Sequence, residues 1–254
     1  GEEIPQYTLL QANAIKMALA GPLVPTLTPE YGIVDMLYLW RDQGQIRRFH
    51  EGPIGQEIQA KILQVKAIRT LAFINRGARN LTSNKPVRSP ADLKGMKIRT
   101  LQVPAHIEAW RMLGATPVPM SINEVFVGLQ QGVIDAQENP VEMIKAMSFF
   151  DVQKYLVKTA HHRGVIWLVA SEKFMQSLSA DDRRLVETEA KAAAAYGDKL
   201  QEALDASIEK ELLAKGMTAI DPDKEAFRNA VKELPAKFAK QWQPGLYEKI
   251  LSMP

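Results

Sequence analysis

The sequence predicts an α/β protein, and the clearest evidence is the order of elements between Gly95 and Pro140. A β-type run at 96–101 is followed by an amphipathic run at 105–113, which ends at a glycine and leads into a second extended run at 116–120. The order strand, helix, strand is typical of a βαβ unit.

The same pattern continues towards Pro140. A helical run at 123–131 stops at a glycine and leads into a third extended run at 133–137. Arg99 in the first strand and Asn139 after the third would then lie on neighbouring strands or strand ends. Ligands of open α/β sheets bind in the crevice beyond the strand ends, so we expect a binding site at these two residues.

The residue types at this edge of the sheet suit an organic acid. A guanidinium is planar and permanently charged and can donate two parallel N–H bonds, so Arg99 is a natural anchor for a carboxylate. The alternative is a structural ion pair. Asn139 can both donate to and accept from the same ligand, and Pro140 fixes the backbone beside it. The alternative for Asn139 and its neighbours is a plain turn that closes a strand.

Composition limits the class of protein further. With 254 residues, 46% hydrophobic and 24% charged, the chain can bury a core of one large domain or two of ordinary size. A net charge of +3 without a long basic block argues against nucleic acid as a partner. No apolar run approaches the roughly 20 residues that span a bilayer. The absence of cysteine excludes disulfides and fits either cytoplasm or periplasm.

A long helix is predicted from Ala180 to Lys215, because this segment has no proline and its apolar residues recur at helical spacing. Ser179 and two following aspartates suit its start, and Gly216 suits its end. At about 1.5 Å per residue it would run about 50 Å, which exceeds one small domain. We therefore expect it to span two, with Gly197 marking either a bend or close packing.

The N-terminal part of the chain alternates in the same way. We expect strands at 14–20 and 70–74, and helices at 5–13, 44–50 and 54–65.

The runs LKGMKIRT, LGATPVPM and EVFVGLQQGVIDAQENP, in this order and spacing, resemble the solute-binding proteins of tripartite ATP-independent periplasmic (TRAP) transporters, the dicarboxylate-binding-protein-like family. These proteins capture organic acids for an ion-driven membrane permease. The flanking runs EYGIVDMLYLWRD, GPIGQEI and RGARNLTSNKPV before, and FFDVQKYL and SEKFMQSL after, extend the resemblance over nearly the whole chain.

The resemblance implies a two-lobed periplasmic-binding-protein fold, with a ligand cleft between the lobes and a long helix that spans both. We expect lobe I at 1–76 plus 165–204 and lobe II at 77–164 plus 205–254. The chain would cross between the lobes at 75–80, near Gly164 and in the long helix. Relatives begin with a strand, a helix and a second strand that precede Gly1 here, and a late start of the sequence is favoured over a truncated gene.

The resemblance also selects site residues. Three arginines, Arg76, Arg79 and Arg88, follow the strand at 70–74, and Arg79 is the one that matches the cleft arginine of the relatives. Many relatives carry an aromatic ring that stacks on the solute at the position of Ile122, so an aliphatic residue there implies a slimmer or less stackable ligand.

The histidines are not spaced as metal ligands. His161 and His162 would point to opposite faces of a strand, and we take His162 as the one that lines the cleft. His50 and His106 are expected to stand alone. The chain has no G-x-S-x-G motif, phosphate loop or paired-carboxylate motif, so we expect no enzyme, no cofactor and no metal site.

The expected function is that of a periplasmic receptor that binds a small organic acid and presents it to a TRAP membrane permease. A hydroxylated sugar acid such as a uronate ranks first, and C4-dicarboxylates and small keto acids rank second. We expect a monomer without a nucleic-acid partner. The alternatives are a ligand-sensing domain for an organic acid and, less favoured, an enzyme that acts on one.

Overall fold

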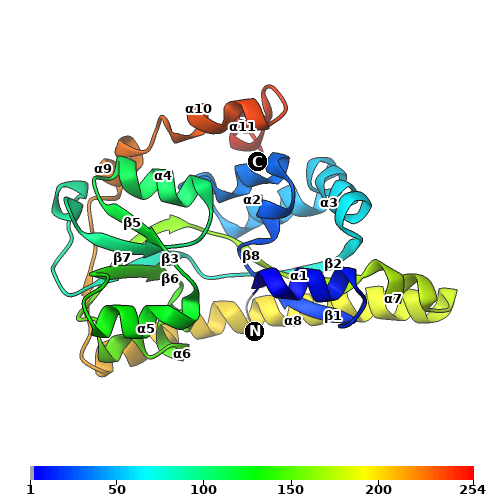
Figure 1. The fold of residues 1–254 in the computed structure, drawn as a ribbon, viewed down its shortest axis with the longest axis horizontal. Helices are drawn as coiled ribbons and strands as arrows, with labels where there is room; N and C mark the ends of the chain where they lie inside the picture. Colours follow the sequence, from blue (N-terminus) through cyan, green and yellow to red (C-terminus); the bar gives the residue numbers. More distant parts are fainter. Residues whose placement is uncertain (1–2) are drawn as a thin grey trace.

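Two β-sheets and one long helix that packs against elements of both organise the computed structural model, which describes residues 3–254 (Figure 1). The chain passes from the smaller sheet to the larger between Asn75 and Arg79, returns between His162 and Val165, and passes again along the long helix. The three predicted crossings are confirmed, and the architecture is the expected two-lobed α/β fold. The residue boundaries of the lobes stay a prediction.

The smaller sheet has three antiparallel strands in the order β1, β8, β2 (Met17–Ala20, Val165–Ser171 and Ile68–Asn75). Its helices are α1 (Glu3–Gln11), α2 (Gln43–Glu51), α3 (Pro53–Lys66) and α7 (Glu172–Ser177), with the 3-10 segments η1 (Val24–Leu27) and η2 (Pro29–Asp35). The first strand starts later than predicted, because the chain turns at Asn13, whose φ is 59°.

The larger sheet has six strands in the order β5, β4, β6, β3, β7, β9 (Thr116–Pro119, Lys97–Thr100, Ala136–Asn139, Arg79–Ser83, Tyr155–His162 and Thr218–Ile220). β4 is parallel to both β5 and β6, which confirms the predicted βαβ units. Their helices are α4 (Pro104–Met112) and α5 (Ile122–Gln130), and α6 (Val141–Ala146) follows β6.

Local chemistry sets the ends of these elements. Ser121 and Glu124 form a capping box at the start of α5. Gly132, just after α5, has a φ of 70°, which side-chain-bearing residues rarely adopt. The turn that it makes delays the third strand, which begins at Ala136 and not at residue 133. Asn139 is therefore the last residue of β6 and does not follow it.

The long helix α8 runs from Ala180 to Ala214, and the Ser179 side chain caps it as predicted by accepting a bond from the backbone N–H of Asp182. It packs against β2 of the smaller sheet and α6 beside the larger one, so it spans both. A Cβ atom at Gly197 would lie 3.0 Å from the Ile74 side chain. Close packing against β2 therefore explains this glycine.

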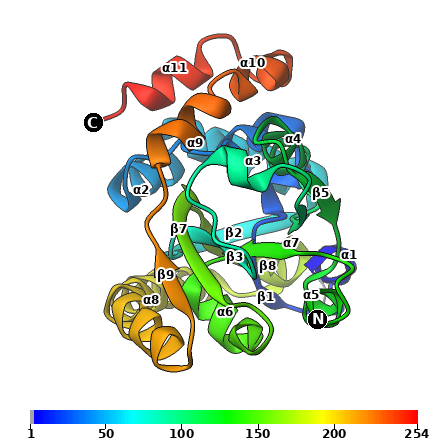
Figure 2. The ribbon, with the colours of Figure 1, turned by 90° about the vertical axis from the view of Figure 1, so that its left-hand side faces the viewer.

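The C-terminal segment runs over the helices on the side opposite α8 (Figures 1 and 2). It contains α9, α10 and α11 (Lys224–Ala230, Leu234–Phe238 and Leu246–Leu251). α10 packs against α4, and the Gln45 side chain of α2 donates to the Ile250 carbonyl of α11 at 2.9 Å. This segment therefore ties elements beside the larger sheet to elements beside the smaller one.

Candidate functional site

A cavity of about 380 Å³ lies where the edge of the larger sheet faces α1 and β1. Four of the five residues predicted for the ligand site line it, namely Arg79, Arg99, Ile122 and Asn139. The other lining residues are Glu3, Ile4, Gln6, Leu19, Gly21, Pro22, Leu23, Arg76, Leu101, Gln102, Met120, Ser121 and Met143.

Sheet topology brings the two arginines and the asparagine together. β6 lies between β4 and β3, parallel to the first and antiparallel to the second. The carboxyl ends of β4 and β6 and the start of β3 therefore meet at one edge of the sheet. Arg99 is paired with Gln137, and Asn139 with Asn80, the neighbour of Arg79.

Arg79 is buried and held from one side. Its Nε and Nη2 donate to the carboxylate of Glu138, with Nη2 to Oε1 at 3.0 Å. Nη2 also donates to the Glu138 carbonyl at 2.7 Å and to Asn139 Oδ1 at 3.0 Å. Burial disfavours the ionised Glu138, but the charge of Arg79 and the hydrogen bonds that Glu138 accepts outweigh it and hold its pKa well below the usual range. The pair therefore fixes the guanidinium in place.

His161 supports this ion pair, and the sequence did not indicate its role or that of Glu138. His161 Nε2 lies 3.0 Å from Glu138 Oε2, and its Nδ1 lies 2.8 Å from Thr159 Oγ1. The histidine ring also contacts Trp110. The only available signal was the position of Glu138 beside Asn139, because the contact with His161 bridges 23 residues of sequence.

Arg99 is 4% exposed, and Nε and Nη2 both donate to the Met120 carbonyl, at 3.0 and 2.9 Å. Its Nη1 is buried without a hydrogen-bond partner among the described residues. Burial lowers the pKa of Arg99 to about 10, and the charges of Glu138 and Arg79 act on it in opposite directions. Arg99 therefore remains a cation at neutral pH, with one donor group left for a ligand.

Asn139 takes part in a chain of buried polar side chains. Besides accepting from Arg79, it donates through Nδ2 to Gln137 Oε1 at 2.6 Å. Gln137 donates to Thr82, which donates to Gln153. This network fixes which end of the Asn139 amide carries the oxygen. The amide oxygen can still accept one further hydrogen bond, and the amide nitrogen can still donate one.

Other polar residues line the cavity that the sequence did not single out. Arg76 is partly buried, and its Nε donates to Glu142 at 3.0 Å. Burial and the nearby Arg79 lower the pKa of Arg76, although Glu142 raises it. Glu3 accepts from the backbone N–H of Leu23 at 2.8 Å, and burial raises its pKa.

The structure places two histidines differently from the prediction. His162 does not line the large cavity but a smaller one of about 30 Å³ beside it. His106 was expected to stand alone, and this is wrong, since its ring centroid lies 4.9 Å from that of His162. His161 and His162 both contact α4 through Trp110 and His106. Ala160 has a φ of 44° and β7 pairs irregularly with β3 here, which breaks the expected strand alternation.

The chain matches the family model of bacterial extracellular solute-binding proteins, family 7, over residues 1–241. A solute-binding protein of Roseobacter denitrificans is 37% identical over 92% of this chain and 72% of its own length. The 2,3-diketo-L-gulonate-binding periplasmic protein of Escherichia coli is 34% identical over 81% of this chain and 63% of its own length.

Solved structures agree with this. A TRAP periplasmic solute-binding protein from Roseobacter denitrificans with bound L-galactonate has a TM-score of 0.92 and 35% identity, covering 99% of this chain and 84% of the other. One from Pseudomonas putida with bound D-glucuronate has a TM-score of 0.91 and 31% identity, covering 100% and 83%. The family match and the fold lead to one assignment. The chain belongs to family 7 of the bacterial extracellular solute-binding proteins, the family that serves TRAP transporters.

Proposed function

We propose that this protein binds a hydroxylated sugar acid in the 380 Å³ cavity and delivers it to a TRAP membrane permease. The observation that carries the proposal is the pair of arginines at the sheet edge. Within residues 3–254, neither Nη1 of Arg79 nor Nη1 of Arg99 has a hydrogen-bond partner, although both guanidinium groups are held firmly by their other nitrogens. Two fixed donors, on the strands on either side of β6, suit the two oxygens of a carboxylate.

The balance of charge favours a monoanion. Arg79 is paired with Glu138 and Arg76 with Glu142, whereas no carboxylate of the described residues lies within salt-bridge distance of Arg99. Burial raises the pKa of Glu3, which favours its neutral form. With Glu3 neutral, one ligand carboxylate would neutralise the cavity, and a second one would be buried without a partner at considerable cost. Sugar acids carry one carboxylate, and C4-dicarboxylates carry two.

The other side chains that line the 380 Å³ cavity suit a ligand with several hydroxyl groups on an aliphatic chain. Glu3, Gln6 and Gln102 offer donors and acceptors, and Ile122 and Met143 offer apolar contact without an aromatic ring. The volume lies within the range of about 300–1,000 Å³ that is usual for small-molecule sites. Structural relatives that hold L-galactonate and D-glucuronate support this class of ligand.

The family of this chain supports delivery of the bound acid, through the periplasm, to a membrane permease. Relatives are named as periplasmic binding proteins. None of the helices in the described part of the chain is long and apolar enough to span a bilayer. A binding protein that must reach a separate permease would carry the acid across the periplasm in the closed state.

A ligand panel tests the proposal. Calorimetry with D-glucuronate, L-galactonate, malate and a small keto acid should show the tightest binding for one of the sugar acids. The recovered ligand, analysed by NMR after incubation, should be unchanged. Tighter binding of malate would contradict the monoanion argument, and turnover of the acid would make the protein an enzyme.

A further inference from the structure

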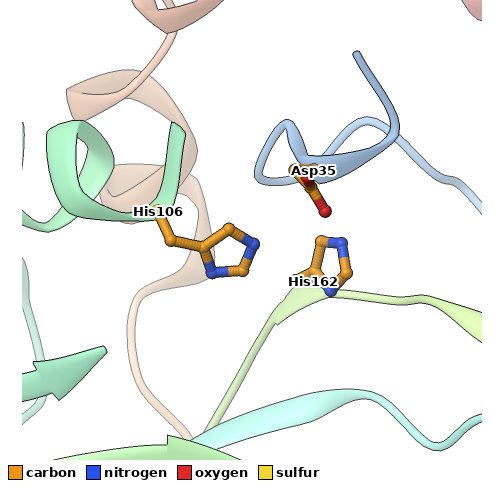
Figure 3. Close-up of side chains that lie close together, drawn as sticks. All are labelled: Asp35, His106 and His162. Carbon is orange, nitrogen blue, oxygen red and sulfur yellow. The ribbon is translucent and has the colours of Figure 1, made fainter. Parts of the chain in front are cut away.

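A second polar cluster lies outside the acid cavity, formed by Asp35, His106 and His162 (Figure 3). Asp35 is the last residue of η2, His106 lies in the first turn of α4, and His162 is the last residue of β7. One potential ligand atom from each residue lies within 4.8 Å of the others, and all three residues are buried. Segments beside both sheets therefore converge on one small space.

The cluster lacks the hydrogen bonds that buried groups normally have. Within the part of the chain that the structure describes, both ring nitrogens of His106 and Nδ1 of His162 are buried without a partner. The Asp35 carboxylate likewise accepts no hydrogen bond from the described residues. More than nine in ten buried polar groups are satisfied in folded proteins. Several unsatisfied groups that face one another indicate a missing common partner.

The chemistry of the three groups identifies that partner. We propose that Asp35, His106 and His162 form a binding site for a divalent transition-metal ion, with Zn²⁺ as the best match. Two imidazoles and one carboxylate are a ligand set that Zn²⁺ uses, with a fourth position left for water. An ion in this position would satisfy the unpartnered nitrogens and the carboxylate together. The sequence predicted no metal site, because these three residues are far apart in the chain.

A backbone carbonyl orients one of the two histidine rings. His162 Nε2 lies 3.3 Å from the Val34 carbonyl, so its N–H points there and Nδ1 presents its lone pair to the cluster. The positive charge of Arg79 acts on all three residues, but Arg79 is paired with Glu138.

Two cavities adjoin the cluster. Asp35 lines the cavity of about 30 Å³ together with His162, which is about the volume of one water molecule. It also lines a cavity of about 220 Å³ together with Ala105, the neighbour of His106. The bound ion would link η2 to α4 and β7 and so clamp segments beside the two sheets together.

Titration with metal alone tests the site without any acid ligand. The tag-free protein is stripped with a chelator and titrated with Co²⁺, whose visible spectrum is intense only in a tetrahedral site, and with Zn²⁺ by calorimetry. We expect one ion per chain, with imidazole ligands in X-ray absorption. At a hundredfold excess of Zn²⁺ over its Kd, Tm should rise by about 5–10 °C.

Substitutions of the proposed ligand residues test where the ion binds. Asp35→Asn and His106→Asn should each weaken Zn²⁺ binding at least tenfold. The control His50→Gln should not, because His50 is a buried histidine that lines the same small cavity but is not one of the three ligands. If the cluster variants fail to fold, the Co²⁺ spectrum and X-ray absorption of the parent protein decide. The proposal is overturned by an octahedral Co²⁺ spectrum, by the absence of binding at millimolar Zn²⁺, or by equal binding in folded cluster variants, which would indicate adventitious surface sites.

Discussion

Replacement of Arg99 is the sharpest test of how the cavity binds its ligand. In the parent protein, two guanidinium nitrogens are occupied by the Met120 carbonyl and the third is buried and unpartnered. Arg99→Ala removes the buried cation and this free donor from the cavity wall. Arg79 cannot take over, because Glu138 and Asn139 hold it in position.

The size of the effect follows from the burial of the contact. Truncation of one partner of a buried, hydrogen-bonded charge pair costs about 2–5 kcal/mol. At 1.4 kcal/mol per factor of ten, the affinity for the acid should fall by about thirtyfold to several thousandfold. Arg99→Lys should also bind poorly, because one ammonium group cannot serve both the Met120 carbonyl and the ligand in the geometry of the fork.

Calorimetry with the best ligand of the panel measures the loss, and Arg88→Ala provides the control. Arg88 is exposed and does not line the cavity, so its removal should leave affinity unchanged. Since the charge of Arg99 is not paired with a carboxylate of the described residues, its loss should reduce binding far more than Tm. A folded Arg99→Ala protein that binds within threefold of the parent would refute the assignment of Arg99 as the anchor.

Three further predictions concern selectivity, motion and pH. Asn139→Ala should weaken binding of the preferred sugar acid by about 1–3 kcal/mol and that of simpler carboxylates less; an equal loss across the panel, measured by calorimetry, would instead make Asn139 a support for Arg79. Because the cavity lies between elements of both sheets, which three crossings join, small-angle scattering should show a smaller radius of gyration with saturating ligand, and equal radii would count against closure. Burial lowers the pKa of His50 to about 3, so the stability that its neutral form contributes is complete above about pH 6.5 and is lost as pH falls towards 3. In denaturant titrations, the difference in unfolding free energy between the parent and His50→Gln should therefore shrink by about 2 kcal/mol from about pH 7.5 to pH 5. This comparison cancels the opposite contribution of Asp35, whose pKa burial raises, and a constant difference would contradict the neutral buried state of His50.

The sequence determined the local elements and identified the candidate anchoring residues. Short-range backbone chemistry sets the alternation of strand and helix, the helix ends at glycines and the cap of the long helix. These features could therefore be predicted within a few residues. Arg79, Arg99 and Asn139 could be named because strand ends are a known location for ligands and because the motifs resemble a family.

Tertiary structure decided what these residues do for one another. Glu138 and His161 can hold Arg79 in place only because β3 pairs with β6 and β7. The local sequence pattern does not encode this pairing. The cluster of Asp35, His106 and His162 depends in the same way on η2, α4 and the irregular end of β7 meeting in space. Periodicity reports which face of an element is buried, whereas the partner across the interface is chosen by packing among segments far apart in the chain.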